Sequence, residues 1–183
     1  LANMAELIRK FVMPLPSVRQ TNLLLFVAGV LLILSGVYME HVMKLEPCPL
    51  CITQRAFFDL IGILGLIAAI HNPSQRGVRI YAALGIAAAI GGAYFAQHQI
   101  WLQSLPKDQV PACGPSVDYM LEVLPWFEVL QTALKGTGDC AEVVWRFLGL
   151  SIPGWTAVFF SLLIVLGLFV MLRRYSPRDW LQS

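Results

Sequence analysis

The chain contains a long apolar stretch without a single charged residue, LLLFVAGVLLILSGVYM, at residues 23–39. A helix needs about 20 predominantly apolar residues to cross the hydrocarbon core of a bilayer. Glu40 and His41 follow the stretch, where a cleavable signal peptide would carry small residues. The sequence therefore predicts a membrane-spanning helix over 23–41 that remains part of the protein.

The composition agrees with a membrane protein. Of the 183 residues 57% are hydrophobic and only 13% are charged, whereas soluble domains carry about 25% charged residues. Further apolar runs predict spans at 52–70, 80–102 and 155–172, the second interrupted by Asp59. We expect an all-α membrane protein, a four-helix transmembrane bundle in which residues 1–183 form a single integral membrane domain.

The distribution of Lys and Arg predicts the orientation of the bundle. Four basic residues, spread over long segments, fall on one side: Lys44, Lys107, Lys135 and Arg146. Eight fall on the other side, in short segments: Arg9, Lys10, Arg19, Arg76, Arg79, Arg173, Arg174 and Arg178. We expect both termini in the cytoplasm, and the loops at 42–51 and 103–153 on the outer side of the membrane.

All four cysteines, Cys48, Cys51, Cys113 and Cys140, lie in the two predicted outward loops. Disulfides persist outside the cytoplasm, so this distribution fits thiol–disulfide chemistry. Two structural disulfides that brace the loops are an alternative, and four cysteines allow three complete pairings. A zinc site is a weaker alternative, because Cys113 and Cys140 do not form a closely spaced pair.

Cys48 and Cys51 form a Cys-x-x-Cys pair beside the second span. Pro47 and Pro49 predict irregular backbone before Cys51 and a helix that begins directly after it. A helix N-terminus favours the thiolate, so Cys51 is expected to be the thiol of lower pKa. Arg55 adds positive charge about one turn further on.

Arg55, Asp59 and His98 are ionisable residues in or near the predicted spans. Arg55 and Asp59 have the spacing of an ion pair on one helix face, which would let both tolerate the membrane boundary. Alternatively, Arg55 hydrogen-bonds the carbonyl of a ligand. His98 is either an interface residue or a second donor that converges with Arg55 on one polar head group.

Two further patterns concern packing. Small residues in the third span, Gly85, Ala88, Gly91 and Gly92, predict close helix contacts. In the long outward loop, apolar residues at helical spacing from 117 to 134 are broken by Pro125, which predicts two short helices on the outer leaflet. Cys113 lies among prolines in irregular, mobile backbone, while Cys140 returns to the membrane surface.

Several motifs together resemble the bacterial disulfide bond formation protein B (DsbB) family over nearly the whole chain. They are the stretch 48–55 (CPLCITQR), Gln97-His98, the stretch 138–142 (GDCAE), Trp145, the stretch 147–150 (FLGL) and the stretch 153–155 (PGW). The resemblance implies a protein of the bacterial inner membrane with its redox loops in the periplasm. It implies reoxidation of a soluble DsbA-type thiol oxidase and transfer of the electrons to a membrane quinone, ubiquinone or menaquinone.

The same resemblance assigns roles to individual residues. Cys113 would exchange with the partner, with Cys140 as its pair. Cys48 would exchange with these second-loop cysteines, and Cys51 would face the quinone. Arg55 would anchor the quinone with His98 as a neighbour. It implies no metal. Membrane lipid is an expected partner and nucleic acid is not.

The redox chemistry is consistent with this scheme, because a DsbA-type oxidase has a potential of about −120 mV and only an acceptor of higher potential can reoxidise it. A quinone in the bilayer is such an acceptor. Two other interpretations are a vitamin K epoxide reductase-like bundle and a non-catalytic membrane protein with structural loop disulfides. The match at 138–155 disfavours the former.

Overall fold

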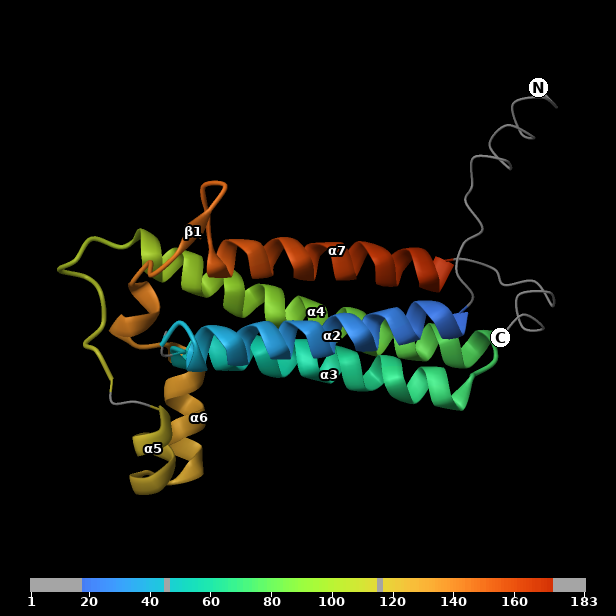
Figure 1. The fold of residues 1–183 in the computed structure, drawn as a ribbon, viewed down its shortest axis with the longest axis horizontal. Helices are drawn as coiled ribbons and strands as arrows, with labels where there is room; N and C mark the ends of the chain where they lie inside the picture. Colours follow the sequence, from blue (N-terminus) through green and yellow to red (C-terminus); the bar gives the residue numbers. More distant parts are fainter. Residues whose placement is uncertain (1–17, 45–46, 115–116, 173–183) are drawn as a thin grey trace.

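Four long helices form the body of the protein in the computed structural model, which describes residues 18–44, 47–114 and 117–172. They run side by side along one axis (Figure 1): α2 (Val18–His41), α3 (Pro49–His71), α4 (Gln75–Ser104) and α7 (Ile152–Leu172). Each is long and apolar enough to cross a membrane. The predicted four-helix transmembrane bundle is confirmed. The start of α2 and the end of α7 lie at the same end of the bundle (Figure 1).

The helices extend beyond the predicted spans. The expected start of the second helix after Cys51 is wrong, because α3 already begins at Pro49. Proline is tolerated in the first turn, where its missing N–H has no intrahelical partner. In α4, charged Arg76 and Arg79 belong to the helix. Apolar runs mark the part of a helix that suits hydrocarbon, so they do not locate its polar ends.

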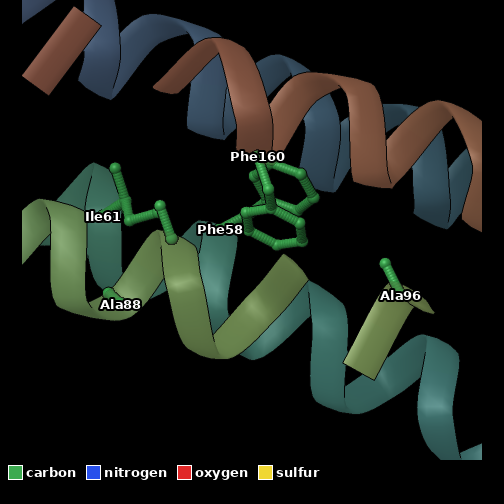
Figure 2. Packing of buried hydrophobic residues seen from close by; sticks show 6 residues of the cluster. Phe58, Ile61, Ala88, Ala96 and Phe160 are labelled. Atoms are coloured by element: carbon green, nitrogen blue, oxygen red, sulfur yellow. The ribbon is translucent and has the colours of Figure 1, made fainter. Parts of the chain in front are cut away.

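The packed core lies where α3, α4 and α7 meet. The rings of Phe58 and Phe160 stack with centroids 4.0 Å apart, and Figure 2 shows them between Ile61, Ala88 and Ala96. Aromatic stacking of this kind adds to the gain from burying the two rings.

Glycines on α4 make room for these aromatic rings. A Cβ atom on Gly92 would overlap the ring of Phe160, and one on Gly91 would meet the ring of Phe57. Close packing through small residues is therefore confirmed at these positions. Gly85 differs, since a Cβ there would meet nothing within 4 Å.

The outward surfaces of α2 and α7 are apolar. Both helices carry large exposed hydrophobic side chains, among them Leu24, Leu31, Leu34, Leu162 and Val165. A contiguous apolar surface of this size suits lipid rather than water. The backbone of each helix satisfies its own hydrogen bonds, as a bilayer requires.

The segment between α4 and α7 has its own secondary structure. Pro125 separates α5 (Val117–Val123) from α6 (Trp126–Lys135), as predicted. Figure 1 shows α6 running across the axis of the bundle, the direction expected of a helix at the membrane surface. The 3₁₀-helix η1 (Gly138–Ala141) follows.

A small hairpin precedes α7 and was not predicted. Strand β1 (Arg146–Phe147) pairs with β2 (Leu150–Ser151) in antiparallel register. Leu148 and Gly149 form the turn with φ angles of 50° and 82°, the combination that a two-residue type I′ turn requires. Leucine is uncommon in this left-handed conformation, so the sequence gives little signal for the turn.

Candidate active site

Three of the four cysteines meet at the outer end of the bundle. Cys48 caps the N-terminus of α3 and Cys51 lies in its first turn, with their Sγ atoms 2.9 Å apart. Cys140, in η1, is fully buried and packs against Cys48. All four cysteines of the chain are free thiols in this structure. Thiol exchange between Cys140 and the Cys48–Cys51 pair therefore needs little movement.

Local structure explains this convergence. Cys48 has extended backbone, with φ −70° and ψ 160°, and the helix starts directly after it. Residues three apart at a helix start lie on one face, which brings the two sulfur atoms together. Leu50, between the two cysteines, is fully buried against Leu102 and Cys140. This apolar cluster holds the first turn of α3 against η1.

A buried glutamine connects the sulfur atoms. Gln99 Nε2 lies 3.2 Å from Cys48 Sγ and 3.4 Å from Cys51 Sγ. Its Oε1 accepts a hydrogen bond of 2.7 Å from Gln54 Nε2. Neither glutamine was predicted to be a site residue, although a polar residue within an apolar span is itself a signal of function.

Cys113 is exposed and lies beside the segment that carries Cys140. The Gly138 N–H donates to the carbonyl of Ala112 at 3.1 Å, and the Gly114 N–H donates to Asp139 Oδ2 at 3.2 Å. The backbone around Cys113 is irregular, as predicted, but these two hydrogen bonds hold it. Cys140 thus lies between Cys113 and the Cys48–Cys51 pair.

The pKa values of Cys48 and Cys140 are shifted in opposite directions. A hydrogen bond from the Cys48 thiol to Cys140 raises the pKa of Cys48 and lowers the pKa of Cys140. Backbone hydrogen bonds from Thr137 and Leu50 also lower the pKa of Cys140, whereas burial raises it, and the result is a pKa of about 6. Contact with Cys51 and burial raise the pKa of Cys48 further. These opposite shifts favour the thiolate at Cys140 and the thiol at Cys48.

Cys113 behaves differently. A hydrogen bond to the Asp139 carboxylate, together with its negative charge, raises the pKa of the Cys113 thiol. In a disulfide between Cys113 and Cys140, the exposed sulfur is the one that a soluble thiolate can reach. Cys140 is then the leaving group, and a thiol of low pKa leaves faster.

Arg55 forms an ion pair with a residue of α2 and not with a residue of its own helix, α3. Its Nη1 lies 3.3 Å from Glu40 Oε2, and its Nη2 donates to the Gly36 carbonyl at 3.4 Å. An ion pair with Asp59 was one of two alternatives that the sequence left open for Arg55, and the structure shows the pair with Glu40 in its place. Among the residues that the structure describes, Asp59 Oδ1 is a buried side-chain oxygen without a hydrogen-bond partner.

Cys51 lies at the junction of two kinds of cavity. A cavity of about 330 Å³ with a mixed polar and apolar lining is bordered by both Cys48 and Cys51, together with Gln99 and Asp139. A cavity of about 110 Å³ on the other side is lined by Cys51 and Arg55.

The second cavity continues into a large apolar one of about 590 Å³ between α2, α3 and α7. The two share the following lining residues: Met39, Arg55, Phe58, Ile152 and Thr156. Asp59 also lines the large cavity, with Trp155 and Phe159 from α7. Cys51 therefore borders one cavity of mixed polar and apolar lining and one that is mainly apolar.

His98 does not line a common site with Arg55, which was one of the two roles that the sequence suggested for it. Its Nε2 donates to the carbonyl of Lys135, at the end of α6, at 3.0 Å, and its ring lies between those of Tyr94 and Trp101. Neither cavity that Arg55 lines includes His98 among the described residues. In this structure His98 fixes α6 to α4.

The convergence of three sulfur atoms raises the question of a metal site. Within residues 18–44, 47–114 and 117–172, no group of three or more His, Cys, Asp and Glu side chains is arranged to hold a metal ion. The geometry instead suits exchange between sulfur atoms.

A model of the family described as "Disulfide bond formation protein DsbB" matches residues 18–170. The chain belongs to this family. A protein of Marinobacter nauticus named disulfide bond formation protein B is 72% identical over 160 residues, covering 87% of this chain and 95% of its own. Proteins of the same name from Hahella chejuensis and Saccharophagus degradans are 56% and 49% identical, covering 75% and 87% of this chain, and 83% and 96% of their own.

Membership of the DsbB family confirms the resemblance seen in the sequence motifs. The matched residues include all four cysteines, the first three spans and nearly all of the fourth. The protein is a multi-pass membrane protein of disulfide bond formation, with the role of a disulfide oxidoreductase.

Proposed function

We propose that the protein is a thiol:quinone oxidoreductase of the bacterial inner membrane. It reoxidises a soluble DsbA-type dithiol oxidase in the periplasm and passes the electrons to ubiquinone or menaquinone. The observation that supports this proposal best is the position of Cys51, which borders a cavity with charged and polar lining residues beside Cys48 and a mainly apolar cavity beside Arg55. A relay from a soluble partner to a quinone in the membrane needs a sulfur atom that can be reached from both the aqueous and the lipid side.

The first half of the reaction takes place at the second outward loop. A thiolate of the reduced partner attacks the sulfur of Cys113 in a Cys113–Cys140 disulfide, and Cys140 leaves as a thiolate. The partner's second thiolate then displaces Cys113 from the mixed disulfide. The partner leaves oxidised, and Cys113 and Cys140 are left reduced.

The second half transfers this reduction to the first loop. The Cys140 thiolate attacks Cys48 of a Cys48–Cys51 disulfide, so that the Cys140–Cys48 bond forms and Cys51 leaves as a thiolate. Cys113 then displaces Cys48, which restores the Cys113–Cys140 disulfide and leaves Cys48 and Cys51 reduced. The low pKa of Cys140 and its packing against Cys48 favour this direction of attack.

The residues around the apolar cavity fit a quinone. Aromatic and aliphatic side chains of α2 and α7 suit its apolar ring and tail, and the Arg55 guanidinium could donate a hydrogen bond to a ring oxygen. Gly36 supports this arrangement, because a Cβ there would displace the Arg55 side chain. When bound, a quinone would supply the acceptor for the two electrons and two protons that Cys48 and Cys51 give up as they return to the disulfide.

The experiment uses the purified full-length chain with a quinone and a reduced DsbA-type partner. We expect Cys51→Ser to abolish quinone reduction, which is followed by absorbance, while Ser161→Ala, at an exposed position of α7, leaves it intact. Quinone reduction at the unchanged rate in Cys51→Ser would contradict the proposal. Loss of folding with normal activity per folded molecule would favour loop disulfides that only brace the structure.

A further inference from the structure

A chain of three buried or half-buried polar side chains leads from α7 to the cysteines. Thr156 Oγ1 donates to Gln54 Oε1 at 2.5 Å, and Gln54 Nε2 donates to Gln99 Oε1 at 2.7 Å. Gln99 Nε2 then faces the sulfur atoms of Cys48 and Cys51. Gln54 and Gln99 are 2% and 3% exposed, so water does not replace these contacts.

The chain of hydrogen bonds sets the direction of the Gln99 amide. A side-chain amide has one accepting and one donating end, and the accepting end of Gln99 is used by Gln54 at 2.7 Å, while Cys51 Sγ is farther from Oε1, at 3.7 Å, than from Nε2, at 3.4 Å. Its N–H groups therefore point to the sulfur atoms. The Thr156 hydroxyl has a second acceptor in the Pro153 carbonyl at 3.0 Å, but its contact with Gln54 is the shorter one.

We propose that Gln99 is a positioning residue, whose amide, held by Gln54 and Thr156, stabilises Cys51 as a thiolate when the Cys48–Cys51 disulfide is opened. The inference rests on the proposed function and adds a residue to its relay. The step is the attack of the Cys140 thiolate on Cys48: the Cys140–Cys48 bond forms, the Cys48–Cys51 bond breaks and its electron pair stays on Cys51. No proton is taken up or released.

The location of Gln99 explains why a neutral donor serves this purpose. The new charge on Cys51 forms at the edge of the membrane, where burial disfavours a thiolate. A hydrogen bond to a charged sulfur is stronger than one to a neutral group. Gln99 also bonds the carbonyl of Cys140 at 3.4 Å, so the same side chain contacts all three residues that exchange.

Two buried amides would be a poor choice for packing alone. Burying an amide costs free energy unless its hydrogen bonds are made, and a leucine of similar size would fill the same space among apolar helices. The amides of Gln54 and Gln99 are partnered by each other, by Thr156 and by the cysteines. A purely structural role would not require this series of hydrogen bonds to end at the cysteine sulfur atoms.

The test measures Cys51 alone, without quinone or partner, so that it remains informative if the proposed function fails. Cys51 is left as the single cysteine by Cys48→Ala, Cys113→Ala and Cys140→Ala. Its rate of alkylation is recorded against pH in detergent, since the thiolate is the reactive form. We expect Gln99→Leu to move the midpoint of this curve up by about one pH unit, as loss of a hydrogen bond to a charged group predicts.

Gln97→Leu is the matched control, because Gln97 is exposed on the same helix. Its midpoint should stay within about 0.4 unit of the parent, as for a surface substitution. In the four-cysteine protein, Gln99→Leu should lower kcat and leave the KM for quinone unchanged, because Gln99 does not line the described part of the apolar cavity.

An unshifted midpoint in Gln99→Leu overturns the proposal. Should this variant fail to fold, as judged by gel filtration and circular dichroism, Gln54→Leu carries the test. It removes the partner that orients Gln99, so we expect a smaller upward shift. A midpoint for Gln54→Leu equal to that of Gln97→Leu would also overturn the proposal.

Discussion

Arg55 of α3 and Glu40 of α2 form an ion pair of 3.3 Å at the edge of the apolar cavity. Both side chains are partly exposed, and exposed ion pairs contribute only about 0–1 kcal/mol to stability. The pair therefore matters more for the position of the Arg55 guanidinium than for the stability of the folded protein. It turns the guanidinium toward α2, where Arg55 lines both the small and the large apolar cavity.

Removal of the guanidinium should weaken quinone binding. We expect Arg55→Met to raise the KM for quinone about tenfold, the loss predicted for a hydrogen bond from a charged donor. Exchange between Cys140 and Cys48 should be unaffected in a single turnover without quinone. Arg79→Met, at an exposed position of α4, is the control. An unchanged KM in Arg55→Met would show that the quinone binds elsewhere.

The ion-pair partner can be tested separately. Glu40→Gln releases Arg55 from a charged partner, and we expect a melting temperature close to that of the parent because the pair is partly exposed. The KM for quinone should change in this variant, since the position of the guanidinium changes. If KM stayed constant while the melting temperature fell, Glu40 would be structural.

The reactivity of the reduced protein should depend on Cys48. The pKa of Cys140 is lowered from 9.0 to about 6 mainly by the Cys48 thiol. Alkylation of Cys140, followed by mass spectrometry, should therefore be half-maximal near pH 6 and should shift upward in Cys48→Ala. Cys113, whose pKa is raised by Asp139, should react only at higher pH. A Cys140 profile that is indifferent to Cys48→Ala would contradict the observed contact.

The same shift has a consequence for stability. Between about pH 6 and pH 9, Cys140 keeps its proton in the unfolded chain and has lost it in the folded one. The unfolded state then binds more protons, so this group makes the free energy of unfolding of the reduced protein rise with pH in that range. The contribution is lost as pH falls through about 6. Thermal melting of wild type and Cys140→Ala over this range, under reducing conditions, measures it as the difference between the two.

The sequence allowed the membrane spans and the cysteines to be predicted, because both depend on composition and local spacing. Uninterrupted apolar runs identify helices whatever their neighbours, and Pro125 separated the two short helices correctly. The exact starts of α3 and α4 were missed, since Pro49 and the charged first turn of α4 are helical for reasons that hydropathy does not record.

Contacts between distant segments could not be predicted in this way. Arg55 has a carboxylate at the right spacing on its own helix, yet it pairs with Glu40 because α2 packs against α3. Gln99 meets the cysteines only because α4 lies against α3 and η1. The role of His98 depends on where α6 ends. Each of these requires the tertiary arrangement.

The backbone position of Cys113 depends on Gly138. A Cβ on Gly138 would overlap the Pro111 carbonyl and lie 3.0 Å from the Cys113 amide nitrogen. We therefore expect Gly138→Ala to displace the segment that holds Cys113 and to slow exchange with the partner. Gly149→Ala is not a suitable control because φ is positive there, but Gly85→Ala is, since a Cβ at Gly85 meets nothing within 4 Å. Normal exchange in Gly138→Ala would show that exchange with the partner does not depend on this backbone position of Cys113.

His98 offers a direct comparison between the sequence-based role and the observed contact. Because His98 Nε2 donates to the Lys135 carbonyl, we expect His98→Leu to loosen the end of α6 and to increase proteolysis of residues 126–135. The KM for quinone should remain that of the parent. A rise in KM comparable to that of Arg55→Met, without increased proteolysis, would instead support the predicted role of His98 beside the quinone.

Asp59 should be a destabilising residue in the ligand-free protein. Its Oδ1 is buried without a partner and it lines the apolar cavity. A buried polar atom without a hydrogen bond costs about 1–3 kcal/mol. Asp59→Leu should therefore raise the melting temperature in detergent, and Asp59→Asn, which keeps a polar group there, should raise it less. Carboxylates in membrane spans are otherwise retained for function, so a stabilised Asp59→Leu with reduced turnover would place this residue in the reaction. A lowered melting temperature in both variants would instead show that the carboxylate has a partner that it needs for folding.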